Sequence, residues 1–371
     1  MQEATLCSPA ADQRLVVESI GSASPGLAGV LASQLGMPPS QVANALYKAP
    51  AVLLDKLPMP HAQGLAEILS QAGLDIRIEP SHGPAPKAAD SLDIALYLHD
   101  PACLATCCER LSRFLGCAPA AVQNMLLAPP GVILGDVSQA TADALQHLLD
   151  DLPVELTCSA RQQARYALFI DRQRGTALSS LLGDLQRMGI DADSAGTLDG
   201  AELDHQQGQY LWRRHQSAGG LRLLDKAFMR YDLSLEQVGP DSCLEQLPDL
   251  AGLPADLVPC VIENLPIVVE EGVCAEQLAA RTEAWAAARM PVRPQLVSLR
   301  CCQLSIEHCP QPDLCLQLLH AVGLIDSSEA NLTLPWRSPV LFGELLPRWL
   351  QGALDTLEAG YHFEDSSHGR D

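Results

Sequence analysis

Two stretches of the chain repeat one another: Leu46–Pro80 reads LYKAPAVLLDKLPMPHAQGLAEILSQAGLDIRIEP, and Leu126–Ser159 reads LLAPPGVILGDVSQATADALQHLLDDLPVELTCS. When residues 35–69 are aligned with residues 115–149, twelve positions are identical and no gap is needed. The identities include a Leu-Gly pair, two prolines and an asparagine, which chance does not usually place in register. The sequence therefore predicts a tandem duplication.

Weaker copies follow along the chain. Leu253–Val273 fits the first copy at an offset of 216 residues, with Pro266 in the place of Pro50. Ser338–Glu364 matches the second half of the first copy, with Pro339 in that place. We expect repeats and connecting segments at 1–80, 92–160, 165–225, 226–297 and 298–364, with a linker at 81–91 and a disordered tail at 365–371.

The copy at 165–225 is degenerate. Tyr166–Ile190 predicts a strand and a helix, and Gln209–Leu224 predicts a helix, an Ala218-Gly219 ending and a strand. The middle helix of the repeat is missing from this pattern. We therefore expect about five repeats, of which the third is incomplete.

The first copy shows what one repeat is. Short β-branched or alternating runs predict strands, and apolar residues at helical spacing predict helices that end at Gly36, before Pro50 and at Gly73. The expected strands are 15–20, 51–57 and 74–79, and the expected helices are 24–36, 38–49 and 60–73. The fold class is therefore α+β, built from small β-α-α-β-α-β modules whose three-stranded sheets carry helices on one face and leave the other face bare.

This order, with its Leu-Gly turn at Leu35-Gly36, its Ala49-Pro50 helix stop and its Ala72-Gly73 before the last strand, resembles the C-terminal domain of the ribosomal stalk protein. The ClpS adaptor shares that fold class. The resemblance implies a fold rather than an activity. Because repeating a small module multiplies surface without repeating any catalytic residue, we expect an interaction protein rather than an enzyme. The positions that carry contact lysines in the stalk family hold Ser40 and Ala43 here, so those contacts are not carried over.

The junctions between repeats differ. The linker Glu79–Ser91 is rich in proline, glycine and alanine, so we expect the first repeat to move and unfold independently of the others. Pro294–Ile306 reads as a long strand without loop residues, so we expect the fourth and fifth repeats to share a strand segment or a continuous sheet and to unfold together.

Charge restricts the possible partners. The 371 residues include 24 Lys and Arg against 45 Asp and Glu, a net charge of −21. An acidic surface repels phosphate backbones and anionic lipids, so we expect neither nucleic acid nor membrane as a partner. Another protein is the expected partner, and its identity is not encoded in any motif of the sequence.

Cysteine usage indicates the compartment. The 13 cysteines are scattered and lack the spacing of a disulfide framework, which is typical of reduced thiols in the cytoplasm. The first fifteen residues contain no basic stretch followed by an apolar one, so we expect no signal peptide.

Candidate chemistry is sparse. The sequence contains no nucleotide-binding, nucleophile-elbow or zinc-protease motif, so we expect no catalytic residues, no cofactor and no enzyme activity. The compact basic segment Leu211–Gln216, with Arg213 and Arg214, is suited to contact an acidic peptide or to form a solvated helix face. The favoured function is a cytosolic adaptor or assembly scaffold.

The alternative is an enzyme or a metal-dependent regulator that uses a cluster of cysteines and histidines in the fifth repeat. Thiolates and imidazoles are the usual ligands of zinc, but the spacing here is not that of a zinc knuckle, and buried structural cysteines are the simpler interpretation. The residues concerned are Cys301, Cys302, His308, Cys309, Cys315 and His320.

Overall fold

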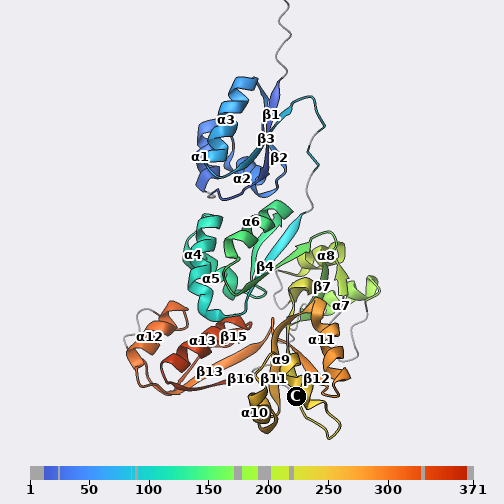
Figure 1. Cartoon of the computed structure of the whole chain (residues 1–371), viewed down its shortest axis with the longest axis vertical. Coiled ribbons are helices and arrows are strands. Elements are labelled where there is room, and N and C mark those ends of the chain that lie inside the picture. Colours follow the sequence, from blue (N-terminus) through green and yellow to red (C-terminus); the bar gives the residue numbers. More distant parts are fainter. Residues whose placement is uncertain are drawn as a thin grey trace, which may run out of the picture. The chain divides into compact units, whose positions relative to one another are not determined.

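The computed structural model describes residues 12–23, 26–84, 86–87, 91–170, 178–190, 202–216, 221–326 and 331–365. Small antiparallel sheets alternate with helices along these residues (Figure 1), which confirms the α+β class. The Ala218-Gly219 ending, residues 85 and 88–90 of the expected linker, and residues 366–371 of the expected tail lie outside the described residues.

Five sheets occur in the described part of the chain, and in each one the first strand in sequence is central. Its neighbours run antiparallel to it. The strands are β1 (Gln13–Ser19), β2 (Ala51–Leu57) and β3 (Asp75–Pro80) in sheet 1; β4 (Leu92–Leu98), β5 (Val132–Val137) and β6 (Val154–Ala160) in sheet 2; β7 (Arg165–Ile170), β8 (Glu202–Asp204) and β9 (Leu221–Asp225) in sheet 3; β10 (Arg230–Leu235), β11 (Ile267–Cys274) and β12 (Val292–Leu296) in sheet 4; β13 (Cys301–His308), β14 (Trp336–Arg337), β15 (Leu341–Phe342) and β16 (Gly360–Asp365) in sheet 5.

The helices occupy the segments between strands. They are α1 (Gly26–Leu35), α2 (Pro39–Tyr47), α3 (Met59–Gln71), α4 (Leu104–Leu115), α5 (Pro119–Leu127), α6 (Gln139–Leu149), α7 (Leu178–Arg187), α8 (His205–His215), α9 (Leu247–Ala251), α10 (Val258–Glu263), α11 (Ala275–Ala287), α12 (Pro312–Ala321) and α13 (Leu345–Thr356).

The register of the sheets brings the two ends of each module together. In sheet 1, Gln13 at the start of the first strand pairs with Pro80 at the end of the last strand. The same holds in the other sheets, for the pairs Leu92 and Ala160, Tyr166 and Asp225, Tyr231 and Leu296, and Cys302 and Asp365.

The first copy folds as its sequence predicts. Every expected strand and helix is present, with boundaries within two residues of the expected ones. The inward face of α2 consists of Val42, Leu46 and, just past the helix, Ala49, all fully buried. Pro50 separates α2 from β2, because a proline disfavours helical geometry at the residue before it.

Left-handed glycines recur at the predicted offsets. Gly36, Gly116 and Gly252 end the first helical segments of sheets 1, 2 and 4, with φ of 64°, 67° and 66°. Gly189 and Gly323 follow α7 and α12 in the same conformation, with φ of 72° and 70°. Glycine adopts this conformation without the strain that a Cβ atom would add. The offsets of 80 and 216 residues therefore hold for the backbone, while the number of repeats stays a prediction.

One proline assignment is wrong. Pro130 and Pro266 lie between a helix and a strand, as Pro50 does, but Pro339 lies between β14 and β15. The assignment failed because sheet 5 divides one edge of β13 between two short strands, and Pro339 falls in the segment that separates them.

Sheets 4 and 5 are also not continuous. Pro294–Ile306 forms the end of β12, a turn at 297–300 and most of β13, and the two strands belong to different sheets. The turn is held to sheet 4, where the Val297 N–H donates to the Arg230 carbonyl oxygen at 2.9 Å and the Arg230 N–H donates to Ser298 Oγ at 2.8 Å. The expectation of one shared sheet is therefore wrong.

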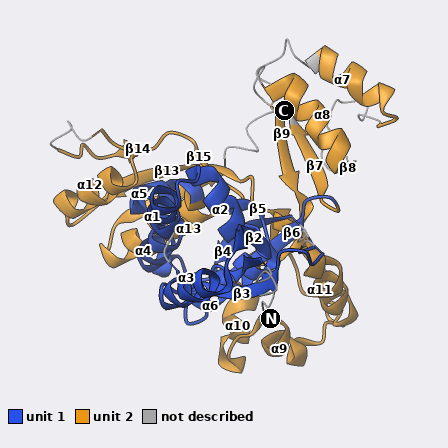
Figure 2. Ribbon diagram, turned by 90° about the horizontal axis from the view of Figure 1, so that it is seen from above, with its two compact units in different colours: residues 1–125, 132–162 blue, residues 126–131, 163–371 orange. Residues whose placement is uncertain are grey.

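Two compact units contain the five sheets, residues 1–125 with 132–162 and residues 126–131 with 163–371 (Figure 2). Sheets 1 and 2 lie in the same unit. The Ser138 N–H and the Thr141 hydroxyl both donate to the Tyr47 carbonyl oxygen, at 2.9 and 2.8 Å, and Lys48 forms an ion pair with Asp136. These contacts differ from the expectation that the first repeat is independent of its neighbour.

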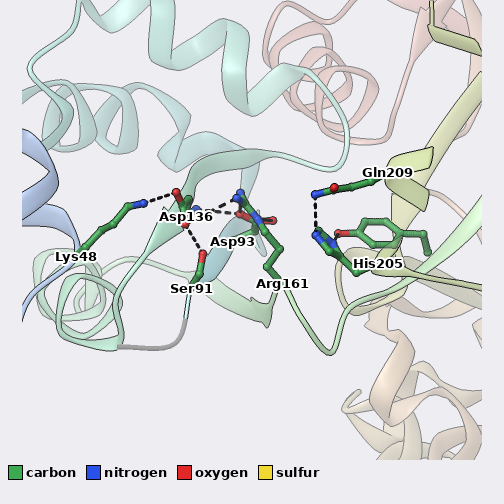
Figure 3. A network of polar contacts seen from close by, with 8 residues as sticks. Lys48, Ser91, Asp93, Asp136, Arg161, His205 and Gln209 are labelled. Atoms are coloured by element: carbon green, nitrogen blue, oxygen red, sulfur yellow. Dashed lines mark hydrogen bonds and ion pairs between the residues drawn. The ribbon is translucent and has the colours of Figure 1, made fainter. Parts of the chain in front are cut away.

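Asp136 belongs to a larger polar network in this unit (Figure 3). Its carboxylate also accepts from the Ser91 hydroxyl, and its N–H donates to Asp93 Oδ1 at 3.0 Å. Arg161 Nη2 donates to the same Asp93 oxygen at 2.6 Å. The network therefore joins Lys48, which follows α2, to strands β5 and β4 of sheet 2 and to Arg161, which follows β6.

The second face of sheet 3 is covered rather than bare. Leu168 is buried on the side of α7 and α8, while Ala167 and Leu224 are buried on the other side. There they pack with Met229 and Tyr231, which belong to the start of the sheet 4 module. Both faces of sheet 3 therefore contribute to the core of the second compact unit.

Candidate interaction site

The cysteine and histidine cluster of sheet 5 lies mostly in an apolar core. Cys302, Cys309 and Cys315 are buried among Leu304, Leu319 and other leucines. Cys301 and His320 are half-buried, and His308 is exposed at the end of β13. Among the described residues, no three cysteine, histidine or acidic side chains come together in a group that could hold a metal ion.

The chemistry of these thiols suits packing better than ligation. Burial, followed by the adjacent Cys309, raises the pKa of Cys315 to about 12. The Cys315 thiol is therefore protonated at neutral pH, as is typical of a buried cysteine in an apolar core. Two further cysteines, Cys107 and Cys108 on α4, are also buried, and burial raises the pKa of Cys107 to about 12 and that of Cys108 to about 11.

The His99-Asp100 pair has a local structural role. Asp100 caps the short helical turn that follows it, its carboxylate accepting from the Ala102 N–H at 2.9 Å. Such a side chain satisfies an N–H that the turn leaves without a partner.

The basic segment Leu211–Gln216 is the C-terminal half of α8. This helix begins at Asp204, whose carboxylate accepts from the Gln207 N–H at 2.8 Å, while Gln207 Oε1 accepts from the Asp204 N–H at 2.9 Å. This reciprocal capping fixes the start of the helix. Its buried side consists of Gly208, Leu211 and His215, which leaves the arginines on the outer side.

A buried carboxylate organises the arginines. The Asp184 side chain on α7 is only 1% exposed, and it contacts three basic groups. His215 Nε2 lies 2.8 Å and Arg214 Nε 2.9 Å from Asp184 Oδ2, and Arg187 pairs with Oδ1. Burial raises the pKa of Asp184, but the hydrogen bond with His215 and the charges of Arg187 and Arg214 outweigh burial and hold it below the usual range.

The outer side of α8 is a shallow surface with an unpaired charge. A depression of about 410 Å³ is lined by Gln206, Gln209, Tyr210, Arg213 and Arg214. The Arg213 guanidinium has no hydrogen bond or ion pair with any described residue. Arg214 Nη1 donates to the Tyr210 hydroxyl at 3.3 Å, which orients the ring.

Polar contacts also order the first turn of α8 (Figure 3). Gln209 Nε2 lies 2.8 Å from His205 Nε2, and the Tyr166 hydroxyl lies 3.3 Å from His205 Nδ1. The glutamine side chain at the rim of the depression is therefore held by a histidine that is anchored to β7.

Sequence reasoning found Arg213 and Arg214 but missed Asp184 and Arg187. The missed residues are a helical turn apart on α7, a spacing that places them on one side of a helix. Their pairing with α8 depends on how two helices pack, and a sequence pattern does not specify that.

No family model matches the chain, and no curated protein or solved structure matches it. None of the helices in the described residues is long and apolar enough to cross a membrane.

Proposed function

We propose that the protein is a non-enzymatic interaction protein, a cytosolic adaptor or assembly scaffold, and that the outer side of α8 binds an acidic segment of a partner protein. The observation that carries the proposal is a local excess of positive charge. Arg187 and Arg214 both pair with the buried carboxylate of Asp184, and Arg213 beside them has no acidic partner among the described residues, on a chain whose net charge is −21.

The composition of this surface is that of a binding site. Tyrosine, tryptophan and arginine are enriched at positions that dominate binding energy. Tyr210, which lines the depression, is 42% exposed, so its ring is accessible to a partner. A glutamate or aspartate side chain can pair with Arg213 while the stem of the partner residue packs on the Tyr210 ring.

A short acidic peptide fits better than a polyanion. The arginines of this surface lie on one helix pair, and the net charge of −21 of the whole chain repels an extended phosphate backbone. Scattered cysteines without a framework spacing support a reducing compartment such as the cytosol. The resemblance to stalk-like and ClpS-like modules supports an adaptor role, with separate modules offering separate surfaces.

The test is fluorescence polarisation with a fluorescein-labelled hexaglutamate peptide and the full-length chain. We expect saturable binding that weakens with added salt, and no binding of a labelled hexaglutamine peptide, which has the same length without the charge. Arg213→Gln weakens binding roughly tenfold, the effect of losing about 1.4 kcal/mol at an interface arginine. Arg289→Gln is the matched control, because Arg289 is also exposed and its side chain has no described partner. Equal affinity of both variants for hexaglutamate contradicts the assignment of α8, and so does preferential binding of a short RNA.

A further inference from the structure

A second cavity lies within the compact unit that contains sheets 1 and 2. Its volume is about 840 Å³, within the range of pockets that bind small molecules and short peptides. One wall is the loop after β1 with the start of β3, and the other consists of α4 and α6. The apolar part of the lining consists of Ala23, Phe114, Ala140, Ala144 and Leu148.

The walls of this pocket carry unpaired charges of opposite sign. Asp75 on the β3 side and Arg113 on α4 are both exposed, and neither side chain has a hydrogen bond or ion pair with a described residue. The other titratable groups of the lining have partners, among them His147, whose Nδ1 lies 3.2 Å from Asp150 Oδ2, but Asp143 keeps its negative charge because its partner is a neutral amide. Arg110 is held by Asp151 and by the Leu148 carbonyl oxygen, and Asp143 accepts from Gln139 Nε2 at 2.8 Å.

The shape of the Asp75 wall is fixed by a close backbone approach. Gly21 and Gly73 both have positive φ, and a Cβ atom at Gly21 would lie 2.3 Å from the Gly73 carbonyl oxygen. The Ser22 N–H donates to the same carbonyl oxygen at 3.1 Å. The loop that forms this wall is therefore held against the start of β3, which gives the pocket a preformed side.

We propose that this pocket binds a short apolar peptide that carries both a carboxylate and an ammonium group, with the carboxylate at Arg113 and the ammonium at Asp75. A guanidinium recognises a carboxylate through paired N–H donors, and a carboxylate recognises an ammonium through charge-assisted hydrogen bonds. The apolar lining between them accommodates aliphatic side chains. A ligand with two negative ends would meet the like charge of Asp75 at one wall. The proposal is independent of the function assigned to α8.

The two charges can come from the free termini of a small peptide or from the side chains of an internal segment of a protein. Two probes separate these sources. The first is the dipeptide Leu-Leu with free termini, and the second is a tetrapeptide Glu-Leu-Leu-Lys that is acetylated and amidated. Isothermal titration calorimetry with the full-length chain should show binding of at least one probe, with a dissociation constant below about 1 mM. The probe that binds identifies the source of the charges.

Variants and blocked ligands decide whether the charges matter. Arg113→Gln and Asp75→Asn each weaken binding of that probe at least tenfold, and Arg289→Gln and Asp241→Asn, at exposed positions outside the pocket, leave it unchanged. If Leu-Leu is the bound probe, its acetylated and amidated forms both lose affinity. Far-UV circular dichroism of each variant confirms that the fold is retained. The proposal is overturned if neither probe binds, or if both pocket variants bind as the wild-type chain does.

Discussion

The Tyr47 hydroxyl donates a hydrogen bond to the Phe114 carbonyl oxygen at 3.1 Å, and the two rings meet edge to face with centroids 6.4 Å apart. Tyr47 ends α2 beside sheet 1, and Phe114 lies in the last turn of α4 beside sheet 2. The same tyrosine accepts two hydrogen bonds at its carbonyl oxygen from the residues that begin α6. Tyr47 therefore contacts both modules, which the sequence analysis predicts to be independent of one another.

Replacing this tyrosine should weaken both sheets together. Tyr47→Phe removes one hydrogen bond while keeping the ring, so we expect the free energy of unfolding to fall by about 1 kcal/mol. Urea denaturation should show sheets 1 and 2 unfolding in one transition. Tyr210→Phe is the control, since its hydroxyl lies on the exposed side of α8. A Tyr47→Phe chain as stable as the control would remove the assigned role.

The same residue should make stability depend on alkaline pH. Burial, together with the nearby Cys117, raises the pKa of Tyr47 to about 12. In the unfolded chain the hydroxyl ionises near pH 10, so the folded state binds its proton more tightly. Stability from this residue is complete below pH 10 and is lost as the pH rises towards 12. Melting temperatures between pH 9 and 12 should therefore fall less steeply for Tyr47→Phe than for the wild-type chain.

Asp184→Asn should destabilise the sheet 3 module strongly. The substitution leaves Arg187, Arg214 and the buried His215 without their carboxylate, so we expect a loss of about 3 kcal/mol. Because the pKa of Asp184 is held below the usual range, its contribution is present at neutral pH and is lost as the pH falls through acid values. Urea denaturation at pH 7 measures the loss, and a change below 1 kcal/mol would contradict the role of the cluster.

Asp232→Asn should have the opposite effect. Burial, reinforced by the charge of Glu271, raises the pKa of Asp232 even though the Gly272 N–H donates to its Oδ1 at 2.9 Å and Arg300 and Arg348 are near. Protonation favours the folded state, and that stabilisation is lost as the pH rises through the raised pKa. The asparagine keeps an acceptor for Gly272 without the charge. We expect a higher melting temperature than wild type at pH 7 and no difference at pH 4.

Thiol reactivity should follow burial. Cys243 and Cys260 are exposed, whereas Cys107, Cys302 and Cys315 are buried with raised pKa values. Brief treatment of the native chain with iodoacetamide, followed by peptide mass spectrometry, should label the first two and leave the other three unmodified. The metal-dependent alternative would instead be supported by two observations together. The purified chain would contain stoichiometric zinc, and this zinc would be released only when Cys302 and Cys315 become labelled.

The elements of the first copy were predictable because their signals are local. The spacing of apolar residues predicts helix α2 and the burial of Val42 and Leu46. Glycine and proline residues predict where the helices end. The turn between β12 and β13 was not predictable, since residues 297–300 contain no glycine or proline. Asp184, Arg187 and the pocket charges Asp75 and Arg113 also escaped detection. The role of each of these residues depends on a partner side chain or a pocket wall, and tertiary packing alone brings these together.

The pairing of each module's first residues with its last has a mechanical consequence. A force applied along the chain pulls on Gln13 and Pro80, or on Leu92 and Ala160, which are neighbours on adjacent antiparallel strands. Such a load acts at one end of the strand pair. It therefore breaks the hydrogen bonds between the two strands one after another, rather than many of them at once by shear. Each sheet should therefore yield at low tension, and stretching should lengthen the chain in separate steps. The same adjacency lets a module be copied or deleted with little displacement of the chain on either side.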